Sequence, residues 1–127
     1  MIEIMQGDIN ELPIHDSDIN SISFKQERTG EYNIIIELSL YEGEYEDIYK
    51  YKNMISANGD VRILCKDCAN INFVTFNGVS QKESIDFINI NITRSSSCFR
   101  NHVEMLMHSG AKLSFNTNYI GLVSPNY

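Results

Sequence analysis

Two stretches of alternating apolar and polar residues lie close together in the first third of the chain. Ile22 and Phe24 alternate with polar residues in the first stretch, and apolar residues recur at nearly every second position over 32–40 in the second. Because successive side chains of a strand point to opposite faces, each stretch predicts a half-buried strand. The residues RTGE at 28–31 include the glycine that a tight turn favours. Residues 15–40 are therefore predicted to form an antiparallel hairpin.

The same alternation recurs further along the chain. It marks residues 61–66, 71–76 and 85–93 as strands, with polar segments between them. A last strand is predicted from Lys112 to about Val123. Residues 67–70, with the sequence DCAN, are predicted to form a bend between two neighbouring strands.

One segment has a different spacing. Its apolar residues follow one another at intervals of four, three and one positions, which places them on one face of a helix. These residues are Phe99, Val103, Leu106 and Met107. The serines at 95–97 can cap a helix N-terminus, and Gly110 suits a helix C-terminus. This pattern predicts a helix over residues 98–109.

These elements predict a mainly β (α+β) fold. Six to eight strands separated by short polar turns favour an antiparallel β-sandwich or rolled sheet, because a parallel α/β core needs a helix after nearly every strand. The chain has 127 residues, which suits one domain covering residues 1–127.

The net charge of −7 is unevenly distributed. Residues 1–60 carry 13 acidic and 4 basic residues, a net charge of −9, whereas residues 61–127 carry 4 acidic and 6 basic residues. An anionic face repels nucleic acids and membrane surfaces and speeds the encounter with cationic partners. No apolar run of about 18 residues predicts a membrane span. The acidic N-terminus does not resemble a signal peptide, so we expect a cytoplasmic location.

Much of this negative charge falls in one segment, residues 41–53, where acidic residues alternate with tyrosines. Tyrosines supply rigid contact area and carboxylates supply charge complementarity, a combination suited to docking Arg and Lys side chains. The alternative is a solvated loop whose charge serves only solubility. The candidate binding residues are Glu42, Glu44, Tyr45, Glu46, Asp47 and Tyr49.

The cysteines offer a second candidate site. Cys65 and Cys68 have C-x-x-C spacing, and Cys98 and His102 add C-x-x-x-H further along, a set that a tetrahedral zinc ion can use. The alternative, which we prefer, is that the cysteines are buried small apolar residues. Three cysteines do not suit a disulfide framework, and in a reducing compartment all three are expected to be thiols.

The sequence contains no recognisable catalytic constellation. His15 and Asp16 are adjacent, and adjacent side chains in an extended chain point to opposite faces, so we interpret them as part of a turn. The chain has no G-x-S-x-G, P-loop or G-x-G-x-x-G motif. We therefore expect a protein that is not an enzyme and holds no cofactor.

The His-Asp-Ser corner and the hairpin after it resemble a group of small bacterial proteins. Some members of this group are immunity proteins of polymorphic toxin systems, including contact-dependent growth inhibition. The resemblance covers about 26 of the 127 residues. The residues that carry it are His15, Asp16, Ser17, Ile19, Ile22, Phe24, Ile34, Ile36 and Leu38.

The resemblance implies a binding function. Such proteins act in the cytoplasm, each capping one cognate toxin domain, commonly a basic nuclease, as a 1:1 complex. The family contributes no catalytic residues. Two alternatives remain, a small zinc-binding module or metal-dependent enzyme using the Cys/His set, and an accessory or oligomerisation domain.

Overall fold

The computed structural model describes residues 2–3, 17–40, 55–56, 59–74, 83–92 and 100–123. These residues form antiparallel strands and contain no helix, which confirms the mainly β prediction. The strands are β1 (Ile2–Glu3), β2 (Asp18–Arg28), β3 (Glu31–Ser39), β4 (Asp60–Val74), β5 (Glu83–Ile92), β6 (Asn101–Met107), β7 (Lys112–Thr117) and β8 (Tyr119–Val123).

The predicted hairpin is confirmed. β2 and β3 pair in antiparallel register, with Ile22 opposite Ile36 and Phe24 opposite Ile34. Gly30 in the turn has a φ of 81°, a left-handed conformation that glycine adopts without steric cost. Every second residue of β3 from Ile34 onward is buried, as the alternation predicted.

The helix predicted over residues 98–109 is wrong where the structure describes it. Residues 101–107 form β6, which pairs with β5 on one side and β7 on the other. Val103, Met105 and Met107 are buried, and the residues between them are partly exposed. Val103 and Met107 fit both a period of two and a helical stripe, so the spacing was ambiguous, and pairing with two neighbouring strands decides it.

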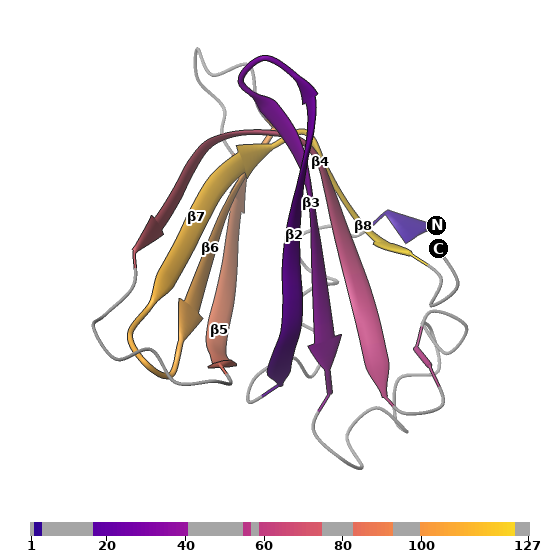
Figure 1. Ribbon diagram of the computed structural model, residues 1–127, viewed down its shortest axis with the longest axis vertical. Coiled ribbons are helices and arrows are strands. Elements are labelled where there is room, and N and C mark those ends of the chain that lie inside the picture. Colours follow the sequence, from indigo (N-terminus) through magenta and orange to yellow (C-terminus); the bar gives the residue numbers. More distant parts are fainter. Residues whose placement is uncertain are drawn as a thin grey trace.

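The strands form two groups that share β4. Hydrogen-bonded neighbours follow the order β1-β8-β4-β3-β2-β5-β6-β7, and β4 pairs additionally with β7. Figure 1 shows β2, β3, β4 and β8 on one side and β5, β6 and β7 on the other, close together at the top of the view and spread apart below. Between β2 and β5, the described residues pair only at Asp18–Ser84 and Ile19–Glu83.

The core is one cluster of buried side chains to which both groups of strands contribute. The largest of them are Phe115, Ile34, Ile36, Leu38, Ile63, Met105, Met107, Leu113 and Leu122.

β4 connects the two groups because it bends twice. Its first part pairs with β3 and β8, and its second part, from Ala69, pairs with β7. An extra residue interrupts the register at each of two places, and Asp67 and Asn70 there have φ values of 54° and 55°. Such bulges bend a strand and let it pass from one sheet to another.

The sequence therefore located the bend correctly but misjudged its role. Residues 61–66 and 71–74, predicted as two neighbouring strands, belong to one continuous strand. Asp and Asn tolerate the left-handed conformation better than other non-glycine residues, which is why the pattern resembled a turn.

The conformation at Asn70 gives a stability prediction. In Asn70→Val, a branched side chain would be forced into the left-handed region, and we expect the free energy of unfolding to fall by about 1–2 kcal/mol. Asn70→Gly, the matched control, should be as stable as the wild type or more so. Urea denaturation measures both, and a valine variant of wild-type stability would show that this bulge is not constrained.

Candidate functional site

A row of polar residues crosses three strands on the face opposite the core. Asp18, Ser39 and Asp60 lie in register on β2, β3 and β4. The Ser39 hydroxyl donates to Asp60 Oδ1 at 2.6 Å and accepts from Asn20 Nδ2 at 2.8 Å. These bonds hold the side chains of Ser39 and Asp60 in place. The carboxylates of Asp18 and Asp60 both stay partly exposed.

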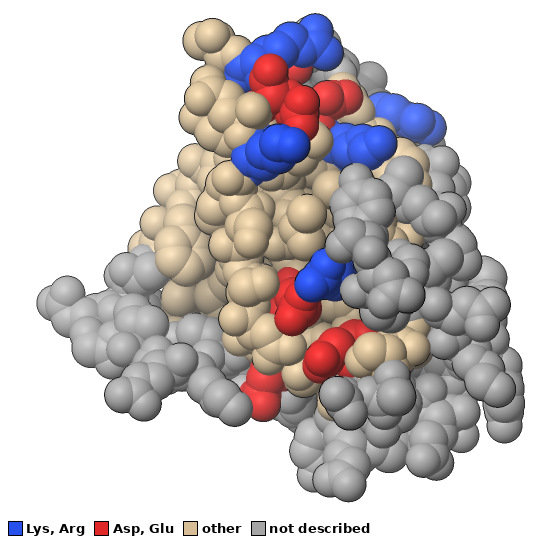
Figure 2. Space-filling model, turned by 45° about the vertical axis from the view of Figure 1, so that its right-hand side comes forward, with Lys and Arg blue, Asp and Glu red and all other residues tan. Residues whose placement is uncertain are grey.

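The adjacent row carries an ion pair. Glu37 on β3 lies opposite Arg62 on β4, and Arg62 Nε donates to Glu37 Oε2 at 2.7 Å. Glu37, Arg62, Asp60 and Ser56 line a hollow of about 110 Å³. Figure 2 shows acidic atoms gathered on the lower part of this face, with basic atoms beside them. The two rows together carry three carboxylates and one guanidinium, so this end of the sheet is anionic.

The anionic rows lie where the chain leaves β3. β3 ends at Ser39, and Leu40 precedes the acidic segment 41–53. The predicted binding residues Glu42, Glu44, Tyr45, Glu46, Asp47 and Tyr49 lie outside the described residues. What the structure adds is a set of carboxylates outside the predicted binding residues, namely Asp18, Glu37 and Asp60.

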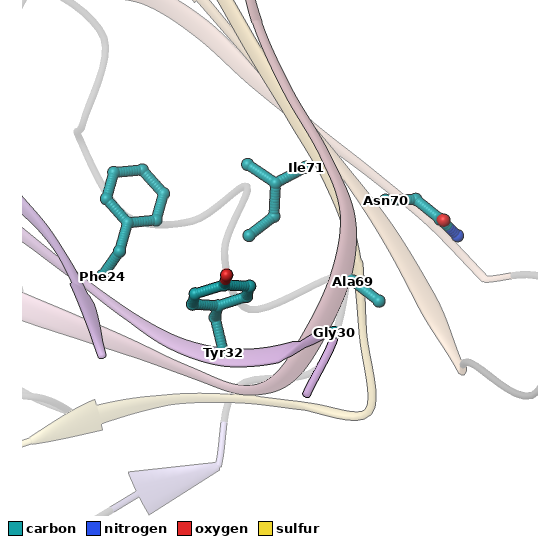
Figure 3. Close-up of a pocket in the computed structure, with 6 residues that line it drawn as sticks. All are labelled: Phe24, Gly30, Tyr32, Ala69, Asn70 and Ile71. Atoms are coloured by element: carbon teal, nitrogen blue, oxygen red, sulfur yellow. The ribbon is translucent and has the colours of Figure 1, made fainter. Parts of the chain in front are cut away.

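The opposite end of the hairpin carries an apolar hollow of about 350 Å³. Figure 3 shows Phe24, Tyr32 and Ile71 pointing into the same space, with Asn70 directed away from it. Phe24 is 47% exposed although it lies on the core face of β2. The alternation placed Phe24 on the correct face, but the residues around it on β2, from Ser23 to Arg28, are exposed as well. Ala69 and Gly30 complete the lining.

The predicted zinc ligands are only partly described. Cys65 and Cys68 are both buried in the core, and their thiols are hydrogen-bonded to each other. His102 lies on β6, with Nδ1 2.8 Å from Asn116 Oδ1 and Nε2 3.4 Å from Glu104 Oε1. Within the described part of the chain, no three His, Cys, Asp or Glu side chains gather as a metal site requires. Cys98 lies outside that part.

Comparison with protein-family models and with curated proteins finds no match to this chain. No helix among the described residues is long and apolar enough to cross a bilayer. The resemblance to immunity proteins therefore depends on the sequence alone, and the physical properties of the surface carry the functional argument.

Glu104 gives a pH prediction. Lys112 Nζ lies 3.4 Å from Glu104 Oε1, and its hydrogen bond, more than His102, holds the pKa of this carboxyl below its ordinary value of 4.5. A lowered folded-state pKa stabilises the fold above the unfolded-state pKa, and that stabilisation is lost as the pH falls through the folded-state value. We expect an NMR titration of Glu104 to have its midpoint below 4.5.

The substitution Lys112→Gln should raise that midpoint, because it removes the largest favourable interaction of the ionised form. Lys25→Gln, which removes a lysine on the distant hairpin, is the matched control and should leave it unchanged. An unchanged midpoint in Lys112→Gln would contradict the assignment.

Proposed function

We propose that this chain is an immunity protein that binds and neutralises a cognate toxin domain, a basic nuclease, in a polymorphic toxin system such as contact-dependent growth inhibition. The observation that supports the proposal most directly is the continuity of negative charge. The carboxylates of Asp18, Glu37 and Asp60 lie at the end of the sheet from which the acidic segment 41–53 departs.

The physical basis is competition for a cationic surface. A nuclease binds the phosphates of its substrate largely through Lys and Arg side chains. A protein with a net charge of −9 over residues 1–60 presents the same sign of charge and can occupy that surface or one beside it. Charge complementarity also accelerates encounter, which matters for an inhibitor that must capture a toxin before it acts.

In this proposal the chain is a single domain that acts in the cytoplasm as a 1:1 complex with the toxin. It needs no cofactor, performs no catalysis and binds neither nucleic acid nor membrane. We further propose that the two groups of strands form a rolled sheet or sandwich, which provides a rigid support. The docking residues would be Glu42, Glu44, Glu46 and Asp47, with Tyr45 and Tyr49 supplying contact area.

The proposal expects the gene immediately upstream to encode a large secreted protein with a variable C-terminal domain, and the test uses that domain. We expect co-expression of the chain to restore growth of cells that produce this domain, and calorimetry to give 1:1 binding. The variant Glu42→Lys, Glu44→Lys, Glu46→Lys, Asp47→Lys should bind about 100-fold more weakly or worse, because several attractive charge pairs become repulsive.

Single reversals locate the contact. Glu44→Lys should weaken binding and reduce its salt dependence, whereas Glu27→Lys changes the net charge equally on the far end of the hairpin and should have little effect. Equal effects of the two variants would mean that only the total charge matters. Wild-type affinity of the quadruple variant would refute the acidic contact, and failure of the wild-type chain to bind or rescue would refute the immunity function.

A further inference from the structure

The first bulge of β4 places two cysteines side by side. Residues three apart in a regular strand point to opposite faces. Here the extra residue at Asp67 puts Cys65 opposite Ile34 and Cys68 opposite Tyr32, two positions on the same face of β3. Both thiols are buried, and they are hydrogen-bonded to each other. The bulge thus converts a C-x-x-C spacing into a close pair of sulfurs.

The two sulfurs differ in their surroundings. Hydrogen bonds from the Cys65 thiol and the Ile34 amide, together with the Thr117 hydroxyl beside them, lower the pKa of Cys68. Cys65 has the opposite environment, because its hydrogen bond to Cys68 and its burial raise its pKa well above the ordinary value of 9.0. One sulfur is therefore suited to be the first nucleophile, and its neighbour remains a thiol.

The cysteine pair is part of the corner at which three strands meet. The Thr117 hydroxyl donates to the Lys66 carbonyl at 2.6 Å, and the Asn118 amide donates to the same oxygen at 3.2 Å. These bonds attach the β7–β8 connection to the residue between Cys65 and the bulge. Because both sulfurs are buried, exchange with a reagent requires this corner to open locally.

We propose that Cys65 and Cys68 form a reversible disulfide by exchange with a low-molecular-weight disulfide. This modification goes beyond the proposed toxin binding and does not depend on it. The resulting disulfide would link the residues on either side of the bulge and stabilise the bend of β4. The stability of the fold would then depend on the redox state of the pair.

The exchange proceeds in two balanced steps. The Cys68 thiolate attacks one sulfur of the reagent, whose S–S bond breaks, and the departing thiolate takes up the proton that Cys68 lost. Cys65 then loses its proton and attacks the Cys68 sulfur of the mixed disulfide, which expels the second half of the reagent as a thiol. In sum, the protein loses two hydrogens and the reagent is reduced to two thiols.

The experiment treats the folded full chain with oxidised glutathione and follows its mass. All variants carry Cys98→Ser, so that only the pair can react. We expect the parent to lose two hydrogens, to retain no glutathione, and to recover on reduction. Cys65→Ala should retain one glutathione on Cys68, because no neighbour resolves the mixed disulfide. Cys68→Ala should likewise form no internal disulfide, because Cys65 then has no partner.

A matched reaction in urea separates folded geometry from the mere presence of two cysteines. The proposal predicts that, at equilibrium with the same glutathione mixture, the internal disulfide of the parent forms to a greater extent in the folded chain than in urea, because the bulge holds the two sulfurs together. It is overturned if the folded parent forms no internal disulfide, or if it forms the disulfide to no greater extent than the chain in urea does. The parent measurement needs no substitution within the pair, so it decides the question even if an alanine variant fails to fold.

Discussion

The bend of β4 is the constraint on which the rest of the structure depends. A straight strand of 15 residues would continue one flat sheet, and its apolar face would stay exposed. The bulges at Asp67 and Asn70 turn the strand, so that its first part pairs with β3 and β8 and its second part pairs with β7, where Ile71 packs against the core. Leu113 and Phe115 from β7 are fully buried in the same cluster as Ile34 from β3, and β4 pairs with both of these strands.

A bulge frees main-chain groups from the regular strand ladder, and such groups are costly if they are buried without partners. The neighbouring elements supply those partners at the first bulge. Asn33 Oδ1 on β3 accepts from the Asp67 amide at 3.3 Å, and Thr117 on β7 donates to the Lys66 carbonyl. Thr117 is completely buried, so its hydroxyl is present for this bond rather than for solubility. Polar side chains from two other strands therefore stabilise the corner.

Sequence periodicity predicted the parts of the fold that depend on alternation within one strand. It predicted the β2–β3 hairpin, its turn and its buried face, because alternation and a glycine are local signals. It failed at residues 101–107, where Val103 and Met107 satisfy two periods and only pairing with β5 and β7 distinguishes them. It also failed to recognise β4 as continuous, because a bulge and a turn use the same residues, Asp and Asn.

The candidate surface was less predictable than the core, for a related reason. The row of Asp18, Ser39 and Asp60 exists only in the register of three strands, and these residues are far apart in the sequence. Alternation does separate the two faces of β3. Ile36 and Leu38 on one face are buried in the core, and Glu37 and Ser39 on the other face outward. Substitutions on the outward positions can change the charge of the surface without changing the volume of the core. A scaffold of this kind can be adapted to different partners while its fold stays the same, which is the property that an inhibitor of variable toxin domains requires.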